Sequence, residues 1–184
     1  GKSTFLKTVA INAILAQTIF TAMADSSRAN YFRIYSSMAL RDNLSGGESY
    51  FIVEIKSLKR IVSQADGRIP MLCFIDEVLR GTNTIERIAA SSQILKQLSL
   101  MNAVCFAATH DIELTSMLED YFDNYHFQEE VKEKQVVFDY KLHQGRAVSR
   151  NAIKLLGMIG FDQTLIDKAQ QSASRFEQTG QWRL

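Results

Sequence analysis

The run from Met71 to Ile75 is the feature that most constrains the fold of this 184-residue chain. Five consecutive apolar residues follow Pro70 and end at two adjacent carboxylates, Asp76 and Glu77. An apolar run of this kind indicates a strand buried on both faces, as in parallel sheets covered by helices. Ligands of such folds bind at the carboxyl ends of the strands. We therefore expect an α/β fold with Asp76 and Glu77 at its functional edge.

Two carboxylates at one strand end need a compensating charge, which a divalent metal with a nucleotide phosphate supplies. In nucleotide hydrolases the first acid of such a pair holds the Mg²⁺ shell, and the second orients and deprotonates the attacking water. The alternative is that the pair only caps the strand and faces solvent. The pair taken alone does not decide between these two interpretations.

The chain begins with Gly1-Lys2-Ser3-Thr4, the second half of the phosphate-binding motif G-x-x-x-x-G-K-[ST], and an apolar helical pattern follows as far as about Met23. Lys2 is expected to reach the β- and γ-phosphates, and the Ser3 hydroxyl to bind Mg²⁺. The amides of the first turn would hold phosphate oxygens. Because the first half of the motif and its strand are absent, we expect a piece of a longer protein that begins inside its nucleotide site.

Composition limits the possible classes of protein. With 46% hydrophobic and 22% charged residues, one core in a single domain over residues 1–184 is expected, and no apolar run approaches the roughly 20 residues of a membrane span. The 21 Lys and Arg residues balance 20 acids, so no strong basic field is available to hold a nucleic acid. Cys73 and Cys105 lie in apolar runs as free thiols, which favours a reducing compartment.

The remaining patterns alternate between strands and helices. A strand is expected over residues 30–38, helices over about 49–64 and 83–100, and a buried strand from 103 to a tip at Thr109, His110 and Asp111. Asn83 is expected to cap the second of these helices. A hairpin of residues 125–131 and 135–142 and helices near 151–156 and 163–178 complete the chain.

Two further positions are candidates for contact with a phosphate. The loop Asp42-Asn43-Leu44-Ser45-Gly46-Gly47-Glu48-Ser49 opens a helix and offers free N–H groups and a hydroxyl to an anion. A second anion-binding helix start suggests a γ-phosphate supplied by another subunit, with ATP linking a dimer, although Ser45 or Ser49 could instead be an ordinary N-cap. His110, at a strand tip beside the acids, is placed to contact a γ-phosphate and report its loss.

The motifs GKST, DNLSGGESYFIVEI, MLCFIDEVLRGTNT and AATHDIELTSM occur in this order, before the hairpin with NYHF and two closing helices. Together they resemble the C-terminal ATPase domain of the MutS-type DNA mismatch repair proteins over essentially the whole chain. The resemblance implies a P-loop NTPase fold: an ABC-like ATPase head with a mainly parallel central sheet flanked by helices, its first P-loop strand missing here, followed by a C-terminal hairpin and helices. Heads of this family dimerise around two composite sites.

The resemblance also implies a role for each candidate residue. The end of the Walker A loop, which binds ATP, matches Gly1, Lys2, Ser3 and Thr4. Asp76 and Glu77 match the Walker B pair, so that Ser3 and Asp76 hold Mg²⁺ and Glu77 is the catalytic base. Ser49 matches the serine that reaches the γ-phosphate of the opposite subunit, and His110 matches the switch histidine.

The function implied is that of a Mg²⁺-dependent, ATP-hydrolysing head whose dimerisation controls a DNA clamp in a cytoplasmic mismatch repair protein. DNA would be bound by parts outside this chain, the partner in trans would be a second copy or a related head, and no membrane contact is expected. The isolated fragment is expected to be inactive. Two alternatives stay open. One is another ABC-type head, of the chromosome-maintenance or transporter kind, because residues 44–48 match its signature and make Ser45 the trans contact. The other is a non-catalytic ATP-gated or structural dimerisation module.

The sequence departs from the family pattern at several positions. Leu79 replaces the first glycine of Gly-Arg-Gly-Thr, Glu86-Arg87 replaces Asp-Gly, and Tyr50 replaces the threonine after the signature serine. The helix-turn-helix that helps to dimerise typical members is not seen before Leu184. These differences spare the groups of phosphoryl transfer and are expected of a divergent branch.

Overall fold

The computed structural model describes residues 1–38, 49–132, 135–147 and 151–182. They fall into two compact units, Gly1–Asn124 and Tyr125–Leu184. The expectation that residues 1–184 form a single domain stays a prediction. The loop of residues 42–48, with Ser45, lies outside the described residues.

The first unit is built on three parallel strands in the order β1-β2-β3. They are β1 (Arg33–Ser37), β2 (Met71–Asp76) and β3 (Ala103–Ala108). The register pairs Arg33 with Met71 and Met71 with Ala103, so the carboxyl ends of the strands lie at one edge. Asp76 at the end of β2, Glu77 directly after it and the histidine after β3 therefore share this edge.

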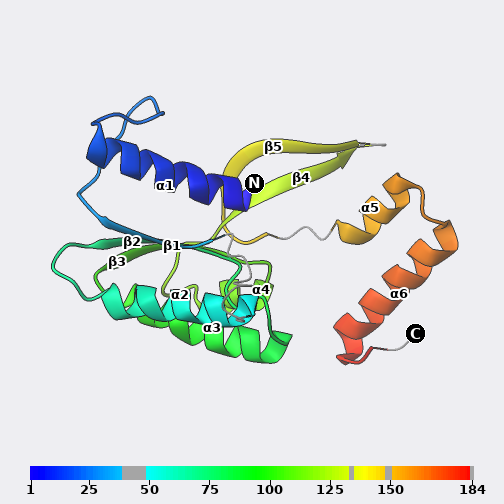
Figure 1. Ribbon diagram of the computed structural model, residues 1–184. Helices are drawn as coiled ribbons and strands as arrows, with labels where there is room; N and C mark the ends of the chain where they lie inside the picture. The colour runs from blue at the N-terminus through cyan, green and yellow to red at the C-terminus, as the bar shows by residue number, and fades with distance from the viewer. Residues whose placement is uncertain (39–48, 133–134, 148–150, 183–184) are drawn as a thin grey trace. The chain divides into compact units, whose positions relative to one another are not determined.

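Helices cover both faces of this sheet (Figure 1). Helix α1 lies on one face, and α2 and α3 lie on the other. Their bounds, with that of the short α4 after β3, are α1 (Lys2–Thr18), α2 (Tyr50–Gln64), α3 (Thr84–Ser99) and α4 (Ile112–Met117). The α/β fold with a parallel sheet flanked by helices is confirmed.

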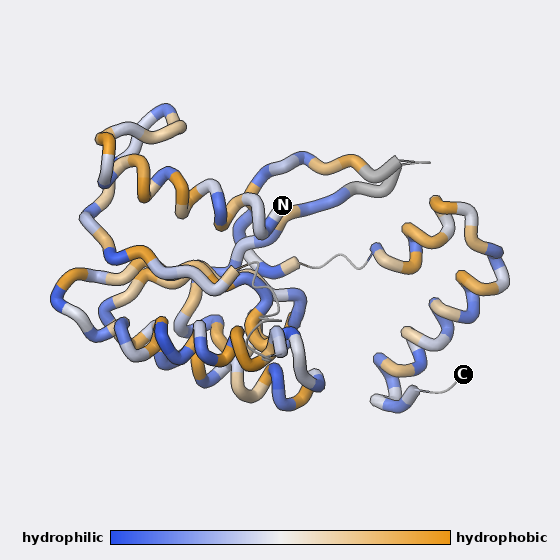
Figure 2. Tube along the Cα trace, viewed as in Figure 1, coloured by the Kyte–Doolittle hydropathy of each residue, from blue (hydrophilic) through white to orange (hydrophobic). Residues whose placement is uncertain are grey.

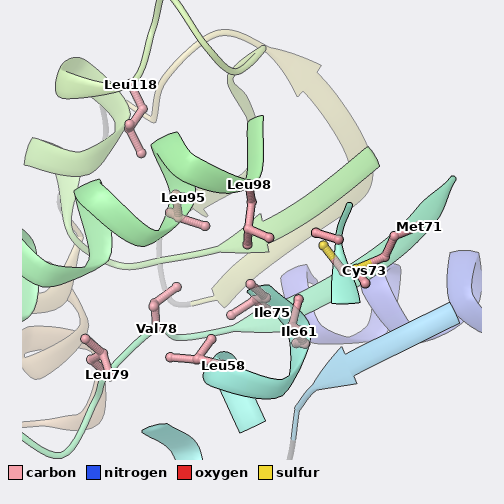
Figure 3. Packing of buried hydrophobic residues seen from close by; sticks show 11 residues of the cluster. Leu58, Ile61, Met71, Cys73, Ile75, Val78, Leu79, Leu95, Leu98 and Leu118 are labelled. Carbon is pink, nitrogen blue, oxygen red and sulfur yellow. The ribbon is translucent and has the colours of Figure 1, made fainter. Parts of the chain in front are cut away.

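Strand β2 is buried on both faces, as its apolar run predicted. Met71, Cys73 and Ile75 pack with residues of α2 and α3 such as Leu58 and Leu98, whose side chains point toward the strand in Figure 3. The alternate residues of β2, Leu72 and Phe74, pack with Leu6 and Ala10 of α1. Each fully buried aliphatic or aromatic side chain contributes about 1.5–3 kcal/mol. Asp76 and Glu77 are therefore attached to the most firmly packed strand of the unit.

The first helix differs from its prediction in length and burial. It ends at Thr18 rather than near Met23, because Ile19 leaves the helical conformation and the Thr18 hydroxyl bonds to the Ile14 carbonyl at 2.7 Å. Its apolar residues lie nearly all round the helix, a pattern that predicts packing inside, against a sheet, and this packing is confirmed on one face only. Ile11 is 54% exposed, since within the described residues only one face of α1 contacts the sheet.

The two outer strands also differ from prediction. Strand β1 starts at Arg33 rather than within residues 30–32, because β2 begins at Met71, directly opposite Arg33. Strand β3 was expected to be buried, yet Val104 is 46% exposed. Within the described sheet β3 has a strand on one side only, which explains its partial burial.

Local signals predicted α3 and the thiols correctly. The Asn83 side chain caps α3 by accepting the Glu86 N–H at 3.0 Å. Such a cap contributes about 1 kcal/mol. Cys73 and Cys105 are both free thiols, as expected.

The second unit contains an antiparallel hairpin and two helices, as predicted, with boundaries shifted by a few residues. These are β4 (Tyr125–Lys132), β5 (Gln135–Gln144), α5 (Ala152–Ile159) and α6 (Gln163–Thr179). Figure 2 shows hydrophobic and hydrophilic residues alternating along α6. Gly160 and Gly180 end the two helices with positive φ of 98° and 66°, which glycine adopts without strain. No helix in the described ranges is long and apolar enough to cross a membrane.

Candidate functional site

Three of the candidate residues meet at the carboxyl edge of the sheet. The Lys2 ammonium lies 3.5 Å from Nδ1 of His110, and Nε2 of His110 lies 3.2 Å from Oε1 of Glu77. The Glu77 N–H donates to the Ala108 carbonyl at 2.9 Å, which fastens the end of β2 to the end of β3. The start of α1 is thereby joined to both strand tips, although Lys2 and Glu77 are far apart in the sequence.

The contacts of His110 are satisfied by one neutral form of its ring. With its proton on Nε2, the imidazole donates to Glu77 and accepts from the Lys2 ammonium through Nδ1. The His110 side chain is 72% exposed and that of Glu77 28%. The pair is accessible to a ligand that approaches from solvent.

The second oxygen of Glu77 is held by a residue that the sequence did not single out. Arg80 Nη1 lies 2.8 Å from Glu77 Oε2. Both carboxylate oxygens of Glu77 are therefore engaged, one by His110 and one by Arg80. The sequence signal for this ion pair was the spacing of three residues between Glu77 and Arg80. Oppositely charged residues at this spacing are too common to predict an ion pair without the fold.

Asp76 and Ser3 fit the donor set that Mg²⁺ prefers. Asp76 Oδ1 is buried and has no hydrogen-bond partner among the described residues. An unsatisfied buried carboxylate oxygen is costly, and a cation or its bound water would satisfy it. Ser3 lies exposed in the first turn of α1. No group of three His, Cys, Asp or Glu side chains that could hold a metal occurs in the described part of the chain. Mg²⁺ binds proteins through one or two carboxylates together with water and phosphate, and Asp76 offers one such carboxylate.

The start of α1 has the form of an anion site. Gly1 is the N-cap of α1 and, as a glycine, has no side chain that could cap the helix. The first backbone hydrogen bond of the helix runs from the Phe5 N–H to the Gly1 carbonyl at 3.0 Å. Ser3 and Thr4 are exposed in the first turn. The first N–H groups of a helix lack partners within it and carry partial positive charge. A phosphate is the kind of ligand that such a terminus binds.

Ser49 is the N-cap of α2, with extended backbone angles of φ −67° and ψ 153°. Its side chain makes no capping hydrogen bond, and the residue is exposed. Among the described residues, Ser49 takes no part in the contacts that join Lys2, His110 and Glu77. The side-chain cap proposed as an alternative role for Ser49 is not formed, whereas Ser45 lies outside the described residues.

Comparison with known proteins identifies the family. The family model for MutS domain V matches residues 1–177. This chain belongs to the MutS domain V family. The resemblance found in the motifs is thereby confirmed at the level of the family.

Three curated relatives illustrate the relationship. The chain is 32% identical over 175 residues to the DNA mismatch repair protein MutS of Pseudothermotoga lettingae and 31% identical over 175 residues to that of Natronomonas pharaonis, with 93% of the chain covered in each case. It is 29% identical over 171 residues to MutS of Thermus thermophilus, with 92% covered. The chain spans about a fifth of the length of these relatives (20–21%).

In this MutS domain V chain, the sequence analysis did not predict one buried carboxylate near the site, that of Glu54. Glu54 of α2 is 2% exposed, and its Oε1 accepts the N–H of Leu79. Burial raises the pKa of Glu54, the nearby charge of Glu77 raises it further, and hydrogen bonds from the backbone of Leu79 and Arg80 oppose this. Burial also raises the pKa of Tyr50, with the charge of Glu54 next in importance. The spacing of four residues between Tyr50 and Glu54 could have indicated that they share a helix face.

A second missed feature is the ion pair between Arg87 and Asp111. Arg87 occupies one of the positions at which the motif resemblance implies a different residue. Its guanidinium donates two hydrogen bonds to Asp111, which is the N-cap of α4 and follows His110 directly. These bonds raise the pKa of Arg87. The Asp111 N–H in turn donates to the Thr109 hydroxyl at 2.9 Å, so the residues on both sides of His110 are held.

Proposed function

We propose that this chain is the ATP-binding and ATP-hydrolysing head of a MutS-like protein, and that it acts as a Mg²⁺-dependent ATPase in the full-length molecule. The observation that carries the proposal is the series of contacts from Lys2 through His110 to Glu77. It joins a helix start suited to phosphate with the carboxylate that would activate water. A phosphate at the start of α1 would lie within reach of all three side chains.

Each residue has one task in this proposal. Lys2 and the first N–H groups of α1 bind phosphate oxygens, and Ser3 and Asp76 hold Mg²⁺. Bound Mg²⁺ would supply positive charge that stabilises the developing charge on the transferred group. Glu77 orients the attacking water and takes its proton.

His110 would sense the γ-phosphate in cis, because it contacts both a phosphate-binding lysine and the base. Since both oxygens of Glu77 are engaged by His110 and Arg80, activation of water requires that Glu77 exchange at least one of these contacts. A phosphate that draws Lys2 and His110 toward itself would bring about that exchange. ATP binding would thereby prepare the base as well as deliver the substrate.

The exposed Ser49 at the start of α2 would contact the γ-phosphate of a second head in trans, so that ATP links a dimer. The names of the relatives, which are DNA mismatch repair proteins, support a role in a DNA-bound assembly. DNA would be held by parts outside this chain, in agreement with its near-balanced charge of 21 basic and 20 acidic residues. A cytoplasmic location belongs to the same proposal.

Steady-state ATP hydrolysis by the full-length protein tests the catalytic part. Glu77→Gln is expected to lower kcat by at least about 100-fold, the typical contribution of a positioned general base. Asp66→Asn is the matched control, because Asp66 is an exposed acid near the opposite end of β2. Lack of ATP hydrolysis by the unsubstituted protein would support the non-catalytic dimerisation module instead.

Light scattering on the Glu77→Gln protein tests the dimer, because blocked hydrolysis should trap an ATP-bound pair of heads. The mass is expected to double on addition of Mg-ATP, and Ser49→Ala is expected to abolish the doubling. Loss of the dimer with Ser45→Ala, but not with Ser49→Ala, would instead indicate the other ABC-type head.

A further inference from the structure

The loop after β2 has an unusual backbone. Glu77 and Leu79 have φ of 58° and 56°, in the left-handed region that non-glycine residues rarely adopt. For a residue with a side chain this conformation is less favourable than a right-handed one. A loop with two of them keeps this form only when its surroundings determine it.

Three hydrogen bonds hold the loop, each from a different element. The Glu77 N–H donates to the Ala108 carbonyl at the end of β3, and the Val78 carbonyl accepts the hydroxyl of Ser91 in α3 at 3.3 Å. The Leu79 N–H donates to Glu54 of α2. The N–H groups of both left-handed residues, Glu77 and Leu79, are thus held by hydrogen bonds.

Of these three anchors, Glu54 is the only side chain that can ionise. It is 2% exposed, and its Oε2 has no hydrogen-bond partner within the described ranges. Burying a carboxylate without full pairing is expensive. Stability alone therefore gives little reason for a buried side chain of this polarity at this position.

The position of Glu54 gives such a reason, because the loop it holds carries two residues of the proposed site. Arg80 follows Leu79 directly and binds Glu77 Oε2 at 2.8 Å, so the backbone at Leu79 determines where both ends of this ion pair lie. Glu54 also lies little more than one helical turn after Ser49, the N-cap of α2. The start of α2 and the loop of the base are thereby joined by one side chain.

We infer that Glu54 is a positioning residue of the proposed ATPase site: by holding the Leu79 N–H, it fixes the loop that places Glu77 and Arg80 and couples this loop to the start of α2. The inference rests on the proposed function. Glu54 contacts the backbone of the loop and acts through Glu77.

The kinetic test compares two substitutions of Glu54 in the full-length protein. Glu54→Gln keeps an oxygen that can accept the Leu79 N–H, so its kcat for ATP is expected to stay within about threefold of the unsubstituted value. Glu54→Ala removes that acceptor and is expected to lower kcat by at least about tenfold while KM for ATP changes by less than about twofold.

Ser57→Ala is the matched control, because Ser57 is a buried polar residue of the same helix, 8% exposed, whose hydroxyl has no partner among the described residues. Its kcat is expected to be unchanged. A purely structural Glu54 would lower Tm in Glu54→Ala and leave kcat per folded molecule as it was. That result, or equal losses of kcat in Glu54→Ala and Glu54→Gln, would overturn the inference.

Amide hydrogen exchange across residues 77–81 provides a readout that does not depend on activity. Exchange is expected to accelerate at least about tenfold in Glu54→Ala and to stay unchanged in Ser57→Ala and Glu54→Gln. Unaltered protection in Glu54→Ala would overturn the inference even if the protein hydrolyses ATP. Absence of hydrolysis by the unsubstituted protein would overturn the proposed function, and with it the catalytic meaning of Glu54, while exchange would still show whether Glu54 holds the loop.

Discussion

Arg87 binds Asp111 through two hydrogen bonds, Nε to Oδ2 at 2.9 Å and Nη2 to Oδ1 at 2.6 Å. The two side chains are only 22% and 14% exposed, and the pair joins α3 to the residue that follows His110. Paired planar groups of this kind combine charge with a fixed orientation. The ion pair of Arg87 and Asp111 thus holds the segment that carries His110 beside the candidate site.

Removing this pair is expected to destabilise the first unit. Arg87→Met keeps most of the apolar stem but loses both hydrogen bonds, and it should lower the free energy of unfolding by about 1–3 kcal/mol. Arg87→Lys, which keeps the charge without the two-pronged geometry, should recover only part of this loss. Urea unfolding of Arg87→Met, Asp111→Asn and the double variant measures the coupling. Strictly additive effects would contradict the expectation.

Substitutions of Leu79 are expected to show an inverted order of stability. Leu79 is 5% exposed, so Leu79→Ala should cost about 2–5 kcal/mol by the loss of buried apolar contacts. Leu79→Gly loses slightly more side chain, but it relieves the left-handed backbone at φ 56°. The glycine variant should therefore be more stable than the alanine variant by about 1 kcal/mol. Thermal unfolding of the two variants measures this order of stability. The opposite order would show that the backbone at Leu79 carries no strain.

Glu54 should make stability depend on pH in a defined direction. Its pKa in the folded chain is raised above the ordinary value of 4.5, mainly by burial. Between that value and the raised one, the folded state binds more protons than the unfolded state, so the free energy of unfolding falls as pH rises. Above the raised pKa the loss is complete. Glu54→Gln does not titrate, so its stability relative to the unsubstituted protein should increase with pH across this window, as measured by urea unfolding from about pH 5 to about pH 8. A constant difference between the two proteins would contradict the expectation.

Gly81 should tolerate no side chain. A Cβ on Gly81 would lie 2.9 Å from the Cβ of Phe51 in the first turn of α2, closer than two such atoms approach. Gly81→Ala must therefore move the loop or the helix, and a loss of about 1–3 kcal/mol is expected from overpacking. Because the loop carries Arg80, kcat should fall as well. An unchanged Tm in Gly81→Ala would show that the contact yields without cost.

Much of the fold could be predicted because its signals are local. The apolar run from Met71 to Ile75 indicated a strand buried on both faces, and the Asn83 cap could be recognised from Glu86 three residues later. The ends of α1 and β1 were predicted less well. They depend on where a neighbouring element begins, and sequence periodicity does not contain that information.

The sequence by itself determined the candidates for binding phosphate, metal and water: Lys2, Ser3, Asp76, Glu77 and His110 were all predicted from short motifs. Only the tertiary structure decided that Lys2, His110 and Glu77 contact one another, and that Arg80 and Glu54 complete their surroundings. The physical reason is that a motif reflects the chemistry of adjacent residues. A contact between distant residues depends instead on strand register and on the packing of helices across a sheet, which the whole chain determines together.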